Sequence, residues 1–290
     1  MKRVITVLML LCCGYFMNCS SFMSGNRAGA EKFTRNALQS AVDSYLAALR
    51  AGDISEMSLA PDAEYNENTE DTIPGEGVFK TPLKIDFHRS LLDVVTGETF
   101  TEVIVTDKTH PYVIGTRLKV SGGKIQEIVS LVTDEGDWLF NADVYLKWSA
   151  SEKWDVIPAD KRSDRKTLIA AADAYCNMFN DPSTKVPWGK PCARLEGGIY
   201  TGKGLPDDTC EVGISGQGGI RLVNRHYVVD EEIGSVDVFL RFDGEDGKPD
   251  SHLFRVEDGK IRYVHTLTVC IEPNCGFPEL PEGVTLPSQE

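Results

Sequence analysis

The sequence lacks the short motifs that identify most catalytic centres. It contains no Gly-x-Ser-x-Gly nucleophile elbow, no His-Glu-x-x-His zinc motif and no Cys-x-x-Cys pair. Its glycine clusters at 75–77 and 216–219 lack the strand–turn–helix setting of a phosphate-binding loop, so we expect turns there. Any reaction must therefore be inferred from the fold and from the side chains that the fold brings together.

Basic residues are scarce as well. Lys and Arg total 30 against 44 Asp and Glu, which gives a formal net charge of −14. A chain of this sign repels phosphate backbones and anionic lipid surfaces. We therefore expect no nucleic-acid partner, and contact with a membrane only through a lipid anchor. The charge leaves the oligomeric state open.

No apolar run in the sequence is long enough to cross a membrane. Residues 1–18 carry two basic residues and then an apolar stretch, which is the pattern of a secretory signal rather than of a spanning helix. Cys19 could be the lipidated cysteine of a bacterial lipoprotein, although residues 16–18 depart from the small residues usual before it. An Ala-x-Ala cleavage site at 28–30 is the alternative. We expect an exported protein that is secreted, periplasmic or anchored at the cell envelope.

Cysteine is absent between residues 20 and 175, and five cysteines follow in the second half: Cys176, Cys192, Cys210, Cys270 and Cys275. An oxidising compartment permits them to pair. Cys192 and Cys210 flank a Gly-rich region and are the first expected disulfide. Cys270 and Cys275 could close a small C-terminal loop, which would leave an odd thiol. We expect no metal site.

Two stretches of the sequence repeat each other. Residues 117–133 (RLKVSGGKIQEIVSLVT) and 253–269 (LFRVEDGKIRYVHTLTV) each read as a strand, a two-residue turn and a second strand, which predicts a β-hairpin. Amphipathic helices are predicted upstream of both, one from an N-cap at Thr34 to about Arg50 and one from an N-cap at Ser163 or Asp164 to about Asn180, and their segments 37–50 and 167–180 match each other. Helices and hairpins recur at nearly the same spacing and in the same order, so a tandem duplication is predicted.

The remaining segments give weaker signals of secondary structure. A short second helix is expected within 53–64, an acidic turn-rich loop at 65–77, and a helix or an extended segment at 85–95. Three antiparallel strands are expected between 98 and 133. Residues 134–162 contain three tryptophans, which a flexible linker would lack, so this segment is expected to pack across both halves and to hold them rigidly.

An N-terminal amphipathic helix, shorter helices and a sheet that ends in a V-x-x-G-K-I hairpin resemble the NTF2-like, or SnoaL-like, superfamily. The ending at 249–270 (PDSH…FRV…GKIRYVHTLTVC) also resembles secreted two-copy proteins of unknown function from fungi and bacteria. The resemblance implies an α+β fold of two cone-shaped domains, each a long N-terminal helix plus short helices packed in a curved antiparallel sheet with a pocket. The superfamily includes ketosteroid isomerase, scytalone dehydratase, polyketide cyclases, limonene epoxide hydrolase and non-catalytic binders, so the implied activity stays open.

The expected division of the chain follows from the duplication and the resemblance. Residues 1–32 form a signal peptide and tether, 33–137 the first NTF2-like domain, 138–162 a Trp-rich connector, 163–272 the second domain and 273–290 a C-terminal tail.

The second hairpin supplies the main candidate site. Regular alternation from its turn places six side chains on one inward face: Val256, Phe254 and His252 opposite Ile261, Tyr263 and His265. On this reading His252 faces His265, and Tyr263 is a neighbouring donor. The same alternation, applied to the first hairpin, places Glu127 on the inward face of its sheet. An apolar setting there would raise the pKa of its carboxyl. Each of these residues could instead be a buried polar group whose hydrogen bonds are all made within the protein. Glu127 could simply pair with Arg117 if the strand register of the first hairpin differs by one residue.

Lesser candidates lie at the expected mouths of the two pockets. They are Tyr65, Asn68, Asp93 and His110 in the first copy, and Glu196, Tyr200, Arg225 and His226 in the second, with Phe254 as a further pocket-lining residue. The first hypothesis is a cofactor-independent lyase, dehydratase or isomerase that acts on a small molecule by acid–base chemistry of His252, His265 and Tyr263, with Glu127 as the corresponding group of the first copy. The alternative is a non-catalytic ligand-binding or cell-surface protein with two rigidly coupled domains.

Overall fold

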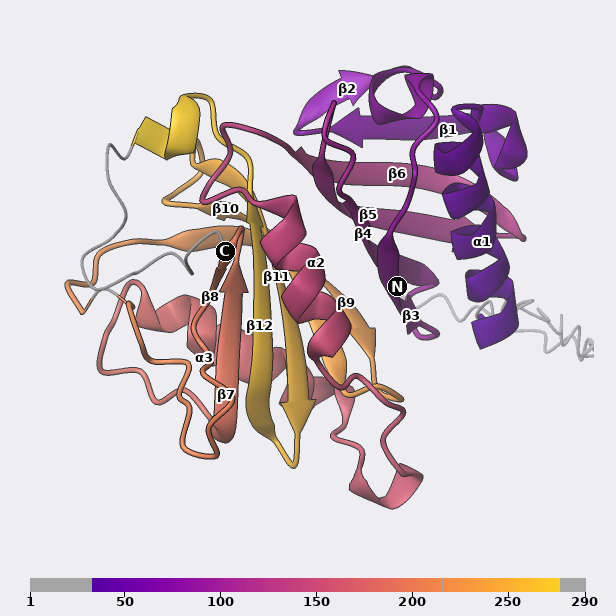
Figure 1. Cartoon of the computed structure of the whole chain (residues 1–290). Coiled ribbons are helices and arrows are strands. Elements are labelled where there is room, and N and C mark those ends of the chain that lie inside the picture. Colours follow the sequence, from indigo (N-terminus) through magenta and orange to yellow (C-terminus); the bar gives the residue numbers. More distant parts are fainter. Residues whose placement is uncertain (1–32, 215, 277–290) are drawn as a thin grey trace, which may run out of the picture. The chain divides into compact units, whose positions relative to one another are not determined.

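The two halves of the chain repeat one order of elements (Figure 1). The computed structural model describes residues 33–214 and 216–276, so the expected signal segment, Cys19 and most of the C-terminal tail lie outside the described residues. The first half contains α1 (Arg35–Ala51), β1 (Leu59–Glu67), β2 (Glu70–Thr72), β3 (Phe87–Asp93), β4 (Glu98–Val105), β5 (Tyr112–Ser121) and β6 (Lys124–Thr133). After α2 (Ala142–Ser151), the second half contains α3 (Arg165–Met178), β7 (Trp188–Glu196), β8 (Ile199–Tyr200), β9 (Leu222–Asp230), β10 (Ser235–Phe242), β11 (Lys248–Glu257) and β12 (Lys260–Thr268). Short 3-10 turns occupy Ile54–Glu56, Gly77–Lys80, Ala159–Lys161 and Pro273–Gly276.

The two long helices begin where the sequence predicts. The Thr34 side chain accepts a hydrogen bond from the backbone N–H of Ala37, and Asp164 does the same for Thr167. Each cap satisfies one of the free N–H groups at a helix start. At the other end of α1, Gly52 adopts φ +63° and returns its N–H to the Ala48 carbonyl. Only glycine takes this left-handed conformation without strain, so α1 ends there.

The sheets have matching strand orders, β2-β1-β6-β5-β4-β3 and β8-β7-β12-β11-β10-β9. Neighbouring strands are antiparallel except for β1 beside β6 and β7 beside β12, which run parallel. The α+β fold class and the duplication are thus confirmed, although each sheet is mixed rather than wholly antiparallel. The helix expected within 53–64 is wrong, because only Ile54–Glu56 is helical and β1 begins at Leu59.

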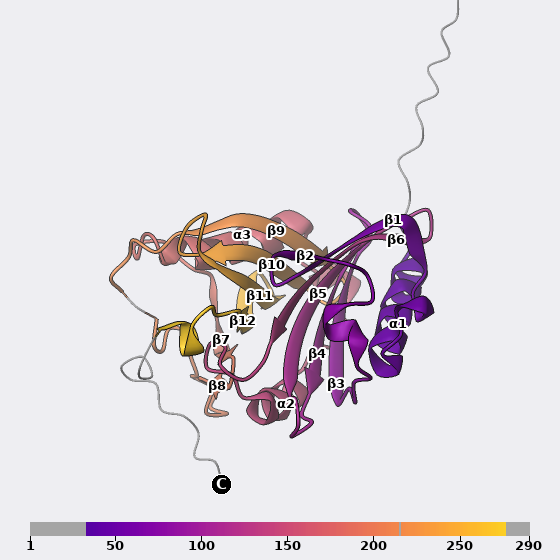
Figure 2. The ribbon, with the colours of Figure 1, turned by 90° about the horizontal axis from the view of Figure 1, so that it is seen from above.

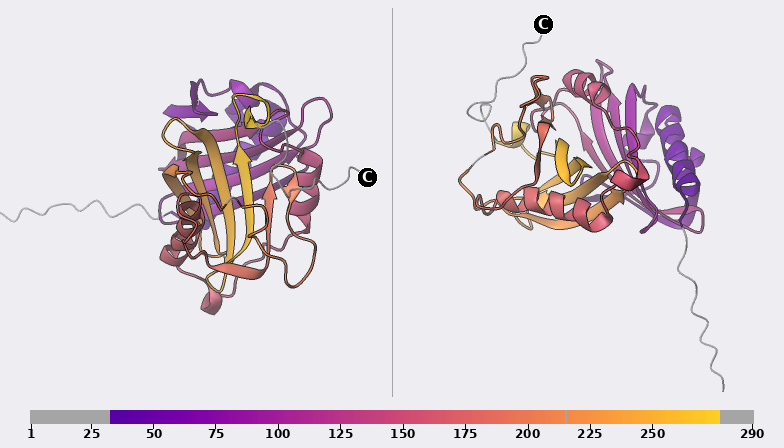
Figure 3. Two further views of the ribbon diagram at one scale, coloured as in Figure 1. Left: turned by 90° about the vertical axis from the view of Figure 1, so that its left-hand side faces the viewer. Right: turned by 90° about the horizontal axis from the view of Figure 1, so that it is seen from below.

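Each sheet packs on both of its faces. We call the face covered by α1 or α3 the inner face, and the face that packs against the other sheet the outer face (Figure 2). The outer faces meet through apolar residues of both copies: Leu91, Phe100, Leu131, Val228, Phe239 and Leu253. In the right view of Figure 3, α1 (indigo) and α3 (pink) each lie against the sheet of their own copy. Among the described residues no helix is both long and apolar enough to cross a membrane.

The Trp-rich connector packs against both copies, as predicted, and it contains a helix that the sequence reading missed. Tyr145 of α2 is fully buried and donates a hydrogen bond to Glu102 of β4 at 2.9 Å. Trp148 stacks on Tyr200 of the second copy with ring centroids 4.1 Å apart. The connector therefore ties the copies together through buried contacts rather than spacing them apart.

Candidate functional site

A cavity of about 380 Å³ lies between the inner face of the second sheet, α3 and the loop before β9. We call it the second-copy pocket. Its apolar wall consists of Trp138, Phe179, Ile214, Ile220 and Phe242, and its polar wall includes Tyr175, Arg194, Glu196, Lys248, Asp250, His252, Thr266 and Thr268. An apolar cleft of this size with a few convergent polar groups is typical of a small-molecule site.

A histidine and a carboxylate lie together in the polar wall. His252 is 2% exposed, and its Nδ1 is 2.8 Å from Oδ1 of Asp250, two residues earlier on the same face of β11. The other carboxylate oxygen of Asp250 accepts a hydrogen bond from the Thr268 hydroxyl at 2.8 Å. The Nδ1–Oδ1 contact is close but lacks hydrogen-bond geometry, so the carboxylate acts on His252 through its charge when the imidazole is protonated.

A buried cation lies in the same wall. Arg194 of β7 is 3% exposed, and its guanidinium binds the Glu196 carboxylate and the Val212 carbonyl. Burial alone lowers the pKa of Arg194, but the Glu196 carboxylate and the neighbouring Tyr175 hydroxyl together outweigh it and the net shift is upward. The group therefore keeps its positive charge inside the protein.

The equivalent interior of the first copy is filled by side chains. Tyr45 of α1 shares a 2.7 Å hydrogen bond with Thr116, which in turn shares one of 2.8 Å with Ser130. The rings of Tyr65 and Phe79, 3% and 1% exposed, pack in the same interior. The two copies therefore differ in chemistry at matching points of one fold.

The predicted opposition of His252 and His265 is wrong. The structure pairs His252 with Thr266 and Leu253 with His265, because Arg262 is an extra residue in β12 between the pairs Val256–Ile261 and Arg255–Tyr263. Such a β-bulge shifts every later side chain by one position and so to the other face. His252 consequently lies on the inner face, whereas Tyr263 and His265 lie on the outer face.

The first hairpin contains the same irregularity. Val120 pairs with Ile125 and Lys119 with Glu127, which leaves Gln126 as the extra residue. The prediction that Glu127 faces inward is therefore wrong. Its carboxylate lies 2.9 Å from the Arg117 guanidinium, the alternative that the sequence left open.

His265 belongs to a buried charge cluster between the copies. Its Nδ1 is 2.8 Å from Glu102 of β4, and its Nε2 is 2.7 Å from Glu152 of the connector. Glu102 also accepts hydrogen bonds from Arg89 at 3.0 Å and from Tyr145 at 2.9 Å. Burial opposes the charge on His265, but the two carboxylates outweigh it and raise its pKa to about 9. His265 is thus a structural cation at neutral pH.

This raised pKa predicts a pH-dependent stability. An unfolded histidine titrates near 6.5, so the contribution of His265 is complete below about pH 6.5 and is lost as the pH rises through 9, about 3 kcal/mol in total. Urea unfolding between pH 6 and 9.5 should show this loss in the wild type. The difference between wild type and His265→Gln should shrink over the same window. A constant difference would contradict the assignment.

The remaining predicted residues of the first copy do not gather in one pocket. Tyr65 is buried beneath Phe79 and donates to Glu67. Asn68 hydrogen-bonds both backbone groups of Val132, at 2.7 and 3.0 Å. Asp93 lies between the copies. None of them faces the second-copy pocket.

Of the site residues predicted for the second copy, only Glu196 and His252 line the second-copy pocket. Tyr200 is stacked under Trp148 on the outer side. Arg225 binds Asp173 and Asn177 of α3 at 2.7 and 2.8 Å. Phe254 is fully buried against the ring of Tyr175.

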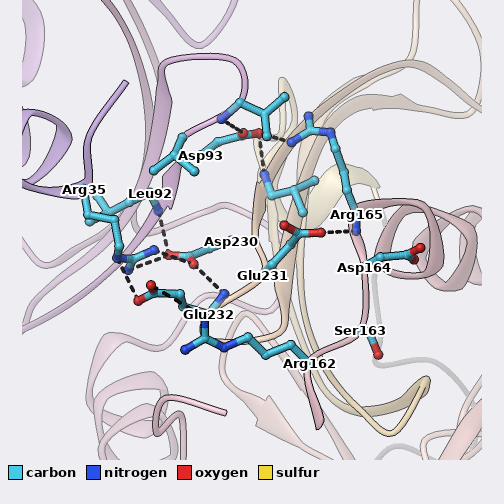
Figure 4. Close-up of a pocket in the computed structure, with 13 residues that line it drawn as sticks. Arg35, Leu92, Asp93, Arg162, Ser163, Asp164, Arg165, Asp230, Glu231 and Glu232 are labelled. Atoms are coloured by element: carbon cyan, nitrogen blue, oxygen red, sulfur yellow. Dashed lines mark hydrogen bonds and ion pairs between the residues drawn. The ribbon is translucent and has the colours of Figure 1, made fainter. Parts of the chain in front are cut away.

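Asp93 is one half of a reciprocal contact between the copies (Figure 4). Arg165 at the start of α3 binds Asp93 at 2.6 Å, and Arg35 at the start of α1 binds Asp230 at 2.8 Å. Each aspartate also accepts a backbone N–H from the other copy, Val229 for Asp93 and Leu92 for Asp230. A cavity of about 370 Å³ lies among these groups, and because its buried aspartates are already paired we assign it a structural role.

Several residues of the second-copy pocket and of the buried charge cluster were not predicted from the sequence. Asp250 and Arg194 were not singled out, although Asp250 stands two residues from His252 and so shares its face of the strand. Tyr175 was not singled out either. Glu102 interrupts the apolar strand TFTEVIV, a signal that could have marked it as a buried, paired carboxylate.

The disulfides follow the expected pairing. Cys192 is bonded to Cys210 and Cys270 to Cys275, which leaves the buried Cys176 as a free thiol. Burial raises the pKa of the Cys176 thiol to about 12, so it remains protonated. Cys275 lines the second-copy pocket, and the short loop it closes is fixed to the connector by a hydrogen bond from Leu139 N–H to Asn274.

Several solved structures are similar to this chain over a little more than a third of its length. They include an NTF-2 like protein of unknown function from Burkholderia xenovorans LB400 (14% identity, 41% of this chain and 96% of that one, TM-score 0.29). An NTF2-like protein of unknown function from Cytophaga hutchinsonii ATCC 33406 is 12% identical over 37% of this chain and 94% of that one, with a TM-score of 0.28. A protein of unknown function with a cystatin-like fold from Methylobium petroleophilum PM1 is 15% identical over 36% and 80%, with a TM-score of 0.29.

Comparison with curated proteins gave no match. A family profile matches the chain twice, over residues 31–132 and again over residues 161–268. These ranges contain the two sheets and their long helices, in agreement with the duplication. The chain belongs to the family described as Domain of unknown function (DUF8021), of which it carries two copies.

Proposed function

We propose that the protein is exported and that its second-copy pocket binds a small molecule and transfers a proton on it without a cofactor, as a lyase, dehydratase or isomerase does. The observation that supports this most is the buried His252, held against Asp250 in the wall of an apolar cavity of about 380 Å³. A histidine beside a carboxylate is a common general acid–base arrangement.

The proposed step uses His252 alone as the proton carrier. Nε2 accepts a proton from a carbon of the bound molecule while Asp250, held by Thr268, stabilises the imidazolium. While it is held on Nε2, this proton exchanges with solvent, and a proton then passes from Nε2 either to a carbon, which is an isomerisation or the reverse of the first step, or to a departing hydroxyl, which is a dehydration. His265 and Tyr263 have no part in this step, because they lie on the outer face of the sheet.

Two features support export. The N-terminal segment has the composition of a secretory signal, and four of the five cysteines after residue 19 form disulfides. Disulfides persist in oxidising compartments such as the periplasm and the extracellular space.

The test is proton exchange in heavy water. A panel of sugars, polyketides and steroids is first screened by thermal shift, since a ligand that binds the folded state raises the melting temperature. Compounds that bind are then incubated with the protein in D₂O, and deuterium incorporation is followed by mass spectrometry. We expect incorporation at carbon with at least one compound. Binding without exchange across the panel would contradict catalysis and would favour a non-catalytic ligand-binding protein.

A further inference from the structure

Besides His252 Nδ1 and Asp250 Oδ1, which lie 2.8 Å apart without hydrogen-bond geometry, three polar atoms in the wall of the second-copy pocket form no hydrogen bond in the described part of the chain. They are the Tyr175 hydroxyl, Nε of Arg194 and the Thr266 hydroxyl. Their residues are 0%, 3% and 5% exposed, so bulk water does not satisfy them. Buried polar groups without partners are costly and uncommon in folded proteins, and three in one cavity wall indicate a missing ligand.

The first copy shows how the fold satisfies the same positions when no ligand is needed. There the Tyr45 hydroxyl, the Thr116 hydroxyl and the Ser130 hydroxyl form an unbroken chain of hydrogen bonds of 2.7 and 2.8 Å. Thr116 pairs with Ser130 across the hairpin, just as His252 pairs with Thr266. His252 thus replaces the central hydroxyl of the chain, and Tyr175 and Thr266 lose the partner that Thr116 provides.

The chemistry of the three groups selects the ligand. Arg194 can only donate, and its guanidinium lies beside the Tyr175 hydroxyl, which keeps its proton because burial raises its pKa. The carboxylates nearby are already engaged, Glu196 by Arg194 and Asp250 by His252 and Thr268. The wall therefore offers unsatisfied donors around a fixed positive charge and needs an acceptor with several lone pairs.

We propose that the ligand of the second-copy pocket is a carboxylate attached to an apolar ring, with its oxygens bound by Tyr175, Thr266 and Nε of Arg194. Phe179, Phe242 and Ile220 of the apolar wall contact the ring. This inference rests on the proposed function, in that it takes the same cavity as the ligand site, but it does not require that His252 be catalytic.

The test compares two ring compounds that differ only in their polar group, naphthalene-2-carboxylate and naphthalene-2-methanol. Calorimetric titration of the full protein at neutral pH should show the carboxylate binding at least tenfold more tightly. Tyr175→Phe and Thr266→Val should each weaken carboxylate binding about tenfold or more, since each removes a hydrogen bond to a charged group, and should leave binding of the alcohol unchanged.

Equivalent variants in the first copy provide the control. Tyr45→Phe and Ser130→Ala should leave carboxylate binding unchanged, and each should lower the melting temperature by about 2–4 °C, because they break satisfied hydrogen bonds. Tyr175→Phe should leave the melting temperature of the unliganded protein within about 1 °C of wild type.

Three results would overturn the inference: no binding of the carboxylate at millimolar concentration, equal affinity for acid and alcohol, or carboxylate binding that survives both second-copy substitutions. These outcomes are distinct from failure of the proposed function. Carboxylate binding without deuterium exchange would refute catalysis alone, whereas exchange on a neutral compound with no carboxylate binding would refute only this inference.

Discussion

Replacing His252 by glutamine is expected to lower the rate of the proposed proton transfer by about 10²- to 10⁴-fold, the usual contribution of a general acid or base. Glutamine approximates the size of the imidazole but does not titrate. Because His252 is buried in the pocket wall beside Asp250, no other histidine on the inner face of the second sheet can replace it. The measurement is the initial rate of deuterium incorporation into a compound found by the exchange screen.

Two further variants make this prediction specific. His110→Gln changes an exposed histidine of the first copy, whose side chain is 55% exposed, and should leave the rate unchanged. Asp250→Asn removes the carboxylate charge 2.8 Å from Nδ1 that stabilises the imidazolium of the proposed step, so it should lower the rate. An unchanged rate in a folded His252→Gln variant would refute the acid–base role.

Replacing Glu102 by glutamine is expected to reduce the free energy of unfolding by about 3–5 kcal/mol, which is the cost of breaking a buried ion pair on one side. The Glu102 carboxylate, 1% exposed, is the common acceptor for Arg89, Tyr145 and His265. Burial raises the pKa of Glu102, but the charges of His265 and Arg89 outweigh it and the net shift is downward, so the native protein holds it ionised. The neutral amide would leave two cations with the single carboxylate of Glu152.

Urea unfolding at pH 7 provides the measurement, and Glu127→Gln provides the control. Glu127 also pairs with a buried arginine, Arg117, but its own side chain is 33% exposed, so its loss should cost about 1 kcal/mol or less. Similar losses of unfolding free energy in both variants would show that the buried charge cluster around His265 stabilises the protein no more than a partly exposed ion pair does. A loss confined to Glu102→Gln would identify this cluster as a main contact between the copies.

The two copies share one fold, but their interiors contain different side chains. Inside the first, a tyrosine, a threonine and a serine bond one another, and aromatic rings occupy the interior. Inside the second, His252 and Arg194 replace Thr116 and Tyr65 at matching strand positions, and a cavity lies beside them. The first copy then supplies Glu102, Arg89 and Asp93, which fix the second sheet in place.

The sequence determined the duplication, the two long helices with their caps, and both hairpins, because these depend on local periodicity and turn chemistry. Asp258 and Gly259 at φ +51° and +69° form the turn that the dipeptide predicts. It also predicted the Cys192–Cys210 disulfide, allowed the Cys270–Cys275 one, and placed His252 on the inner face of the second sheet. It did not give the strand at 59–67, because a β-strand that pairs in parallel with β6 depends on a partner far along the chain.

The tertiary structure decided which candidate side chains meet. A single extra residue, Arg262, moves Tyr263 and His265 to the outer face of the sheet, and Gln126 does the same to Glu127. A bulge leaves no mark in the alternation of so short a strand, since one inserted residue changes the face but not the composition. The partners of His265, Glu102 and Glu152, lie far from it in the sequence, whereas Asp250 lies two residues from His252 on the same strand. Only packing of the two sheets put one histidine in a cavity and the other between two carboxylates.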